Sequence, residues 1–182
     1  MKIRKLTPEY YPKAASLLSH AFAPNRYEVQ LFDKLHEHDR TIHEWVCLVR
    51  DSVVAYIRFT NAYNVKKIVG LHLGPIAVQP QMQRQGIGSE LLRFALRQEI
   101  IRESRIFVLG DVKFYQKFGF ESCAAPRCPF DKGNRNFLSI RNAGDEEYMV
   151  GYEPEFAAII KEKKIEINDK RWHRRNDGIK NS

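Results

Sequence analysis

The sequence predicts an α/β fold (mixed α+β) in which a mixed sheet carries helices on its faces. The chain has 182 residues, 43% of them hydrophobic and 29% charged, which is typical of a globular domain with its own core. Runs of β-type residues alternate with segments of helical spacing. One strand, Leu71–Val78, changes its apolar side partway along, which predicts a distortion of the sheet.

The first 60 residues predict a strand, two helices and a β-hairpin. Ile3 and Leu6 favour a strand over residues 2–6. Thr7-Pro8 is typical of a helix start, and apolar residues at helical spacing predict helices over residues 8–23 and 26–38, with Pro12 delaying the first. Apolar runs at residues 45–49 and 53–60 flank a turn at Asp51-Ser52 and predict the hairpin. Residues 61–67 are expected to be a connecting loop.

The strand at Leu71–Val78 has an irregular pattern. Leu71 and Leu73 fall on one face, whereas Ile76 and Val78 fall on the other. Side chains alternate strictly along a regular strand, so the switch requires a bulge or a kink at Gly74-Pro75. We expect backbone groups there to lack partners in the sheet.

The rest of the chain continues the alternation. Helices are expected at residues 86–102 and 112–118, and strands at 105–109, 120–123, 137–140 and 147–152, the last two set in or after a loop-rich stretch from 124 to 145. Beyond Pro154 the pattern is helical to about Lys164. We therefore expect one domain over residues 1–152, followed by a basic C-terminal helix and tail over residues 153–182.

Composition narrows the classes of function. The net charge of +8 favours an anionic partner, but residues 161–182 hold eight basic and four acidic residues, and a basic tail is usually a solvated end. No apolar run approaches the roughly 20 residues of a membrane span, and none follows the basic start as in a signal peptide. The spacing of Cys47, Cys123 and Cys128 matches no zinc motif. We expect free thiols in a reducing cytoplasm, no membrane association and no metal.

A glycine-containing loop, Gln83–Ser89, lies between a predicted strand and a predicted helix. Glycines let the backbone approach a ligand closely, and a helix start favours an anion such as pyrophosphate. A Rossmann fingerprint is excluded because Leu91 stands where a third small residue is needed, and a P-loop is excluded because Gly-Lys-Ser/Thr is missing. An ordinary glycine-containing helix start is the simpler interpretation of the loop alone.

The segment Gln83-x-x-Gly86-x-Gly88 after this strand resembles the acyl-CoA loop of the GNAT superfamily of N-acetyltransferases. A second segment, Tyr115-x-x-x-Gly119-Phe120, resembles the helix-to-strand segment that carries a tyrosine beside the CoA sulfur in that family. The resemblance covers roughly residues 1–125, and the strand order extends it to about Tyr152. It implies the GNAT fold: a central mixed, mostly antiparallel sheet of about six or seven strands, splayed at Leu71–Val78 and flanked by about four helices.

The resemblance also implies a cosubstrate site for acetyl-CoA. Backbone groups of the splayed strand would pair with the pantetheine arm, one N–H holding the thioester oxygen, and the loop would wrap the pyrophosphate. The implied cofactor-binding residues are Ile76, Ala77, Val78, Arg84, Gln85, Gly86, Ile87, Gly88 and Ser89.

Acetyl transfer to an amine also needs an acid for the leaving thiolate and a route for the amine proton. Tyr115 suits the first role because a phenol is a donor at neutral pH, although it could simply pack between Phe114 and Phe118. His72 is the candidate base, since an imidazole pKa near 6.5 suits proton removal, but it could equally fill a partly polar face. Glu44 is the second candidate base, and an exposed carboxylate there could also be only a solvated strand end.

These features predict an enzyme: an acetyl-CoA-dependent N-acetyltransferase acting on a primary amine of a small molecule or a protein, with a homodimer left open. Two alternatives remain. One is a catalytically silent acyl-CoA sensor with the same fold. The other is an RNA-associated module whose tail, with Trp172 and His173, contacts nucleic acid, which one tryptophan supports only thinly.

Overall fold

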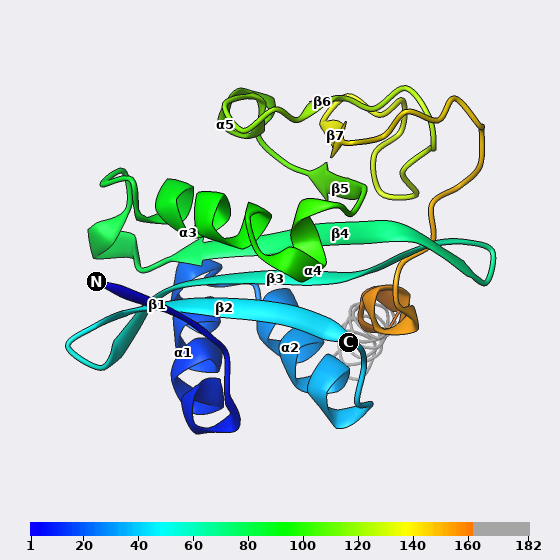
Figure 1. The fold of residues 1–182 in the computed structure, drawn as a ribbon. Helices are drawn as coiled ribbons and strands as arrows, with labels where there is room; N and C mark the ends of the chain where they lie inside the picture. The colour runs from blue at the N-terminus through cyan, green and yellow to red at the C-terminus, as the bar shows by residue number, and fades with distance from the viewer. Residues whose placement is uncertain (162–182) are drawn as a thin grey trace, which may run out of the picture.

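The structure, a computed structural model, describes residues 1–161. Seven strands form one sheet in the order β1-β2-β3-β4-β5-β7-β6 (Figure 1). Their bounds are β1 (Lys2–Lys5), β2 (Ile42–Val49), β3 (Ser52–Asn64), β4 (Lys67–Val78), β5 (Ile106–Leu109), β6 (Glu121–Ser122) and β7 (Phe137–Ile140). Neighbouring strands are antiparallel except β4 and β5, which are parallel. The mixed, mostly antiparallel sheet predicted from the sequence is confirmed.

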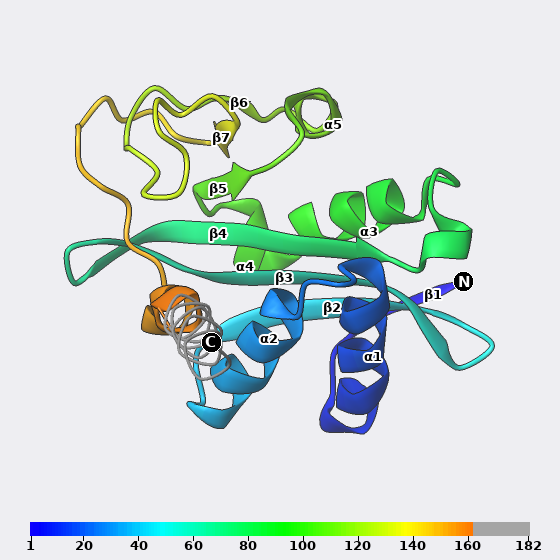
Figure 2. The same cartoon turned by 180° about the vertical axis from the view of Figure 1, so that it is seen from behind.

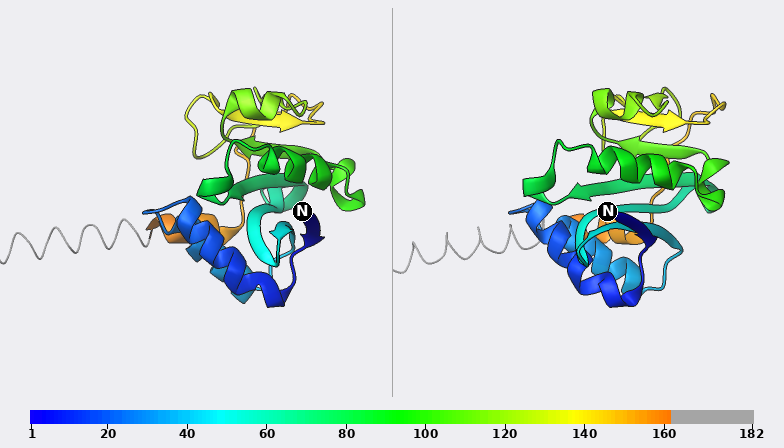
Figure 3. Two further views of the ribbon diagram at one scale, coloured as in Figure 1. Left: turned by 90° about the vertical axis from the view of Figure 1, so that its left-hand side faces the viewer. Right: turned by 60° about the vertical axis from the view of Figure 1, so that its left-hand side comes forward.

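Helices cover both faces of the strands β1 to β4 (Figures 1 and 2). Their bounds are η1 (Pro8–Tyr10), α1 (Tyr11–Ala21), α2 (Tyr27–Glu37), η2 (Pro80–Met82), α3 (Ile87–Leu96), α4 (Glu99–Arg102) and α5 (Val112–Gln116). The pair α1 and α2 lies on one face, and α3 and α4 lie on the other; the side views separate the two layers (Figure 3). Residues 154–161 are also helical, and Ile159 packs there against Leu31 and Leu35 of α2.

The sheet separates two apolar cores. On the α3 face, Leu91 and Leu92 pack with alternate residues of β2, β3 and β4. On the α1 face, Leu17 and Leu18 pack with Val46 and Tyr56 of the same strands. The apolar sides of the helices face these cores, so the sheet positions α3 on one side and α2 on the other side of β4.

The predicted distortion of β4 is confirmed. Ile57 of β3 pairs with Ile76, but Phe59 pairs with Leu73, so Arg58 alone stands opposite both Gly74 and Pro75. This two-against-one count is a β-bulge. Because of the extra residue, Leu71 and Leu73 before the bulge and Ile76 and Val78 after it all pack into the core on the α3 face.

Three expected elements differ in the structure. Residues 61–67 form the end of a long hairpin between β3 and β4, since backbone pairing continues to Asn64 and Lys67 through a segment of polar composition. The helix expected over residues 86–102 is divided into α3 and α4, because Gln98 adopts an extended conformation and caps α4. Residues 147–152 make only the isolated bridges Tyr63–Gly151 and Arg127–Met149.

The predictions for the C-terminal tail concern residues outside the described ones, including Lys164, Trp172 and His173. Within residues 1–161, no helix has the length and apolar character needed to cross a membrane. Cys47, Cys123 and Cys128 are free and buried.

Candidate active site

The strand β4 has an open edge beyond its bulge. It pairs with β5 only at Leu71–Leu73, where the Leu71 N–H donates to the Arg105 carbonyl at 2.8 Å. On the opposite edge, the Gln79 N–H donates to Val54 of β3 at 2.8 Å. Since backbone groups alternate between the two edges, the N–H and C=O groups of Ile76 and Val78 point to the open edge, and those of Ala77 point to β3.

The glycine loop lies against this open edge. The Gln83 side-chain amide donates to the Val78 carbonyl at 3.1 Å. Gly88 is packed close to the strand, because a Cβ placed there would lie 3.2 Å from Cγ2 of Val78. The sequence-predicted residues of the strand and of the loop are thus brought together.

The loop presents backbone donors at the start of α3. Gly86 caps the helix with φ +83°, a left-handed conformation that favours glycine. The N–H groups of Ile87, Gly88 and Ser89 belong to the first helical turn and have no acceptor within the helix. Arg84, Gln85 and Gly86 are exposed. The helix dipole adds partial positive charge here, which favours a phosphate group.

Tyr115 lies on α5, in the core on the α3 face. Asp111 caps α5 by accepting from the backbone N–H groups of Lys113 and Phe114, at 2.9 and 3.3 Å. The Tyr115 ring is 8% exposed and makes edge contacts with Phe114 and Phe120. Burial, helped by the charge of Asp111, raises the pKa of Tyr115 to about 12, so the phenol keeps its proton at neutral pH.

His72 points to the other face of β4 and does not contact Tyr115. It is 3% exposed, and its Nε2 lies 3.0 Å from the Gly151 carbonyl. A carbonyl cannot donate, so Nε2 carries the proton and Nδ1 is the acceptor of the ring. The ring stacks on Tyr152 at 3.6 Å. Burial lowers the pKa of His72 to about 3, against a smaller opposing effect of the bond to Gly151.

His72 borders a cavity of about 310 Å³ that begins at the bulge of β4. The walls come from both ends of the chain and are mostly apolar and aromatic: Tyr27, Glu28, Arg58, His72, Leu73, Gly74, Leu109, Phe130, Tyr152, Phe156 and Ile160. The sequence reasoning found only His72 in this set. The sequence could also have indicated Arg58 as a site residue, because Arg58 is the one charged residue in the apolar run of β3.

Glu44 does not border this cavity, and the expectation that it is exposed is wrong. It is 5% exposed and lies under α2. Its Oε1 accepts from the Tyr56 hydroxyl, and its Oε2 lies 3.0 Å from Nε2 of His36. Both oxygens are therefore occupied, one by a side chain of β3 and one by a side chain of α2.

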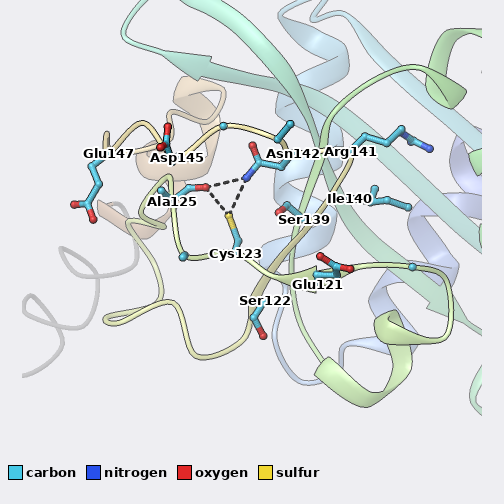
Figure 4. A pocket seen from close by; sticks show the side chains of 14 residues that line it. Glu121, Ser122, Cys123, Ala125, Ser139, Ile140, Arg141, Asn142, Asp145 and Glu147 are labelled. Atoms are coloured by element: carbon cyan, nitrogen blue, oxygen red, sulfur yellow. Dashed lines mark hydrogen bonds between the residues drawn. The ribbon is translucent and has the colours of Figure 1, made fainter.

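Another cavity, of about 650 Å³, lies at β6 and β7 (Figure 4). Figure 4 shows Asn142 and Cys123 bonded to the Ala125 carbonyl, at 2.8 and 3.1 Å, beside the acidic side chains Asp145 and Glu147. No sequence-predicted site residue lines it. We therefore place the candidate active site at the open edge of β4.

The comparisons with known proteins agree with this fold. The family model described as "Acetyltransferase (GNAT) domain" matches residues 40–122, which contain β4, the glycine loop, α3 and α5. A curated relative, "Uncharacterized N-acetyltransferase YjhQ" of Escherichia coli K12, is 36% identical over 56 residues. That match covers 30% of this chain and 31% of the relative.

Two solved structures align along most of the chain. The GNAT family N-acetyltransferase YhbS of Escherichia coli, in complex with CoA, is 24% identical with a TM-score of 0.77, over 86% of this chain and 91% of that one. A GNAT family acetyltransferase of Brucella melitensis, in complex with acetyl-CoA, is 25% identical with a TM-score of 0.72, over 85% and 97%. With the splayed strand and the loop in place, the chain contains a GNAT acetyltransferase domain, matched over residues 40–122, and shares its fold with the acetyltransferases solved with CoA and acetyl-CoA.

Proposed function

We propose that this protein transfers an acetyl group from acetyl-CoA directly to a primary amine bound in the cavity at the bulge of β4. One observation carries the proposal: the backbone N–H groups of Ile76 and Val78, at the open edge of β4, lie between the donor-rich loop at α3 and that cavity. A thioester held along the open edge of β4 would place its carbonyl group between the glycine loop and the cavity. The solved relatives with bound CoA and acetyl-CoA support acetyl-CoA as the cosubstrate.

In this proposal the cosubstrate is bound by backbone and loop groups. Ile76, Ala77 and Val78 would line the pantetheine arm, and an N–H of Ile76 or Val78 would hold the thioester oxygen. Loss of such a donor typically costs about 3–4 kcal/mol of barrier. The backbone N–H groups from Arg84 to Ser89 would bind the pyrophosphate.

The reaction forms a C–N bond and breaks a C–S bond. The ammonium form of the acceptor loses one proton before its nitrogen attacks the thioester carbon, and the tetrahedral intermediate loses a second proton. Tyr115, protonated at neutral pH, donates to the departing sulfur and regains a proton from the reacting nitrogen through solvent. The products are the acetamide, CoA and one proton.

His72 contacts the amine in this proposal as a neutral imidazole and does not take up the proton that the amine loses. A group with a pKa of about 3 is too weak a base to retain a proton at pH 7. Its Nδ1 can accept a hydrogen bond from the neutral amine and orient the nitrogen lone pair. The first proton then leaves to solvent.

Residues 154–161 belong to the functional unit as we propose it. Glu155 is bonded to His38 and Arg40 at 2.6 and 2.9 Å, which fixes this helix, and Phe156 reaches the cavity. The basic segment after it is then an appendage to the catalytic domain. The three free thiols support a reducing compartment such as the cytoplasm.

The test is a mass-spectrometric screen of amines and lysine peptides with acetyl-CoA, combined with chromatography of the CoA released. We expect an acetylated amine and CoA in equal amounts, and a higher melting temperature with acetyl-CoA. Binding of acetyl-CoA without acetylation of any amine would instead support a sensor.

A further inference from the structure

The cavity at the bulge of β4 has walls suited to a flat ring. Tyr152 stacks on His72 and makes tilted or edge contacts with Phe130 and Phe156, at centroid distances of 4.9 and 5.1 Å. Tyr27 donates its hydroxyl to the Phe156 carbonyl at 3.3 Å, so its polar end is already bonded. Aromatic pairs of this kind are favourable beyond the area that they bury.

A guanidinium with an unused donor borders the same cavity. Arg58 is 1% exposed. Its Nε donates to the Gly74 carbonyl at 3.0 Å, and its Nη2 lies 3.3 Å from Glu28. Its Nη1 has no hydrogen-bond partner anywhere in residues 1–161.

An unpaired buried donor on a charged group is costly, and such groups are normally satisfied by protein, water or ligand. Arg58 stands where the bulge opens, beside the position of the reacting carbonyl in the proposed function. A ligand oxygen in the cavity would satisfy Nη1, and a carboxylate or a carbonyl has the required acceptor chemistry.

We propose that the acceptor is a small amine with an aromatic ring and a carbonyl or carboxylate oxygen, the ring lying among Phe130, Tyr152 and Phe156 and the oxygen bonding Arg58. This rests on the proposed function, because it names the amine that the site would acetylate. The volume of about 310 Å³ is at the low end of small-molecule pockets, which favours a free amine over a lysine of a folded protein.

The test compares phenylalanine amide, phenylalanine, 2-phenylethylamine, leucine amide, cadaverine and a lysine peptide as acceptors. We expect kcat/KM for phenylalanine amide or phenylalanine to exceed that for 2-phenylethylamine, which lacks the oxygen, and for leucine amide, which lacks the ring, by at least tenfold each. A higher kcat/KM for phenylalanine amide would show that Arg58 bonds a carbonyl oxygen, and a higher value for phenylalanine would show that it bonds a carboxylate. A preference for cadaverine, leucine amide or the peptide overturns the proposal and leaves N-acetyl transfer intact.

Matched variants test whether the aromatic ring of the acceptor contacts Phe130. Phe130→Leu should lower kcat/KM for phenylalanine amide about tenfold more than kcat/KM for leucine amide, and should leave acetyl-CoA binding unchanged. Phe22→Leu is the control, because Phe22 lies in the core on the α1 face. It should leave the ratio of kcat/KM for phenylalanine amide to kcat/KM for leucine amide unchanged. Arg58→Lys keeps the positive charge but loses the planar guanidinium and its several N–H donors. It should reduce the preference for phenylalanine amide over 2-phenylethylamine to below threefold. Equal effects of Phe130→Leu and Phe22→Leu would overturn the proposal.

A readout without turnover separates the two proposals. Calorimetric titration of phenylalanine amide and leucine amide into the CoA-bound protein measures the pocket alone. If no amine is acetylated but phenylalanine amide binds at least tenfold more tightly, the proposed function fails and the pocket assignment stands. Equal or absent binding of the two amides overturns the pocket assignment.

Discussion

The ring of Tyr115 rests on the backbone of Gly110. A Cβ placed on Gly110 would lie 2.7 Å from Cε2 of Tyr115, closer than atoms in a packed interior approach. Phe114 and Phe120 contact the same ring. The absence of a side chain at residue 110 therefore sets where the phenol lies.

Gly110→Ala should displace Tyr115 and lower kcat by at least tenfold, because the added methyl group occupies the place of the ring edge. Steady-state kinetics with saturating acetyl-CoA measure the effect. Gly144→Ala is the matched control, since the nearest atom to its Cβ would be 3.7 Å away. Equal activity of the two variants would show that the ring adjusts without cost.

Tyr115→Phe removes only the phenolic oxygen. If that oxygen protonates the thiolate, kcat should fall about a hundredfold to ten-thousandfold, while acetyl-CoA affinity stays nearly constant. The measurement is kcat under conditions where chemistry is rate-limiting, with affinity measured separately. An unchanged rate would assign Tyr115 to packing alone.

Gly86→Val should weaken acetyl-CoA binding by at least tenfold. The φ of +83° is unfavourable for valine, and a shift of this backbone would turn the loop donors away from the pyrophosphate. Gly133→Val is an equivalent control, with φ +89° and open space around its Cβ, but away from the loop. Calorimetry with acetyl-CoA compares them; a similar loss of affinity in both variants would trace the effect to general destabilisation.

His36 should make stability depend on pH. Its Nδ1 and Nε2 face the Phe32 carbonyl and the Glu44 carboxylate at 2.7 and 3.0 Å, so both nitrogens suit donors. Burial acts to lower the pKa of His36, but the bond and charge of Glu44 outweigh it, and the pKa is raised. A raised folded pKa means that this stabilisation is complete below the unfolded value near 6.5 and is lost as pH rises through the folded value.

Urea unfolding at a series of pH values between 5 and 9 measures this dependence. His36→Gln should flatten it and cost about 1–3 kcal/mol at low pH. His20→Gln is the matched control, because His20 makes the same Nδ1 contact with the carbonyl four residues earlier but lies exposed. A wild-type pH profile in His36→Gln would contradict the assignment.

The pH dependence of catalysis tests the role of His72. With its pKa at about 3, His72 stays neutral from pH 5 to 9, so kcat/KM should rise with the deprotonation of the amine and show no break near 6.5. Amines of different pKa should shift the profile by the difference between them. A break near 6.5 that is independent of the amine and absent in His72→Gln would identify His72 as the base.

The sequence predicted the bulge of β4 because side chains alternate between the two faces of a regular strand. Four apolar residues are enough to test that local rule. Leu71, Leu73, Ile76 and Val78 cannot share one core face without an extra residue between them, and the structure places that residue opposite Arg58. The loop at Gly86 was also predictable, because a glycine at the start of a helix forms a pattern with residues only a few positions away in the sequence. Whether these residues bind acetyl-CoA remains a prediction.

The cavity could not be predicted in the same way. Its walls include Tyr27, Phe130 and Phe156, which are separated by about a hundred residues or by a loop without regular pattern. Only tertiary packing brings them to the end of β5. The environment of Glu44 was misjudged for the same reason: α2 covers it, and no local pattern reports which strand a helix will cover.

Residues 154–161 have a consequence for how specificity can diverge. The implied acetyl-CoA contacts lie within residues 76–89, whereas two walls of the cavity, Phe156 and Ile160, come from this last described helix. The helix is attached through Glu155 to His38 and Arg40, outside both regions. In the proposed function, substitutions in this helix would therefore reshape the acceptor side without altering the cosubstrate side, and exchange of this single segment between relatives would be a short route to a new acceptor.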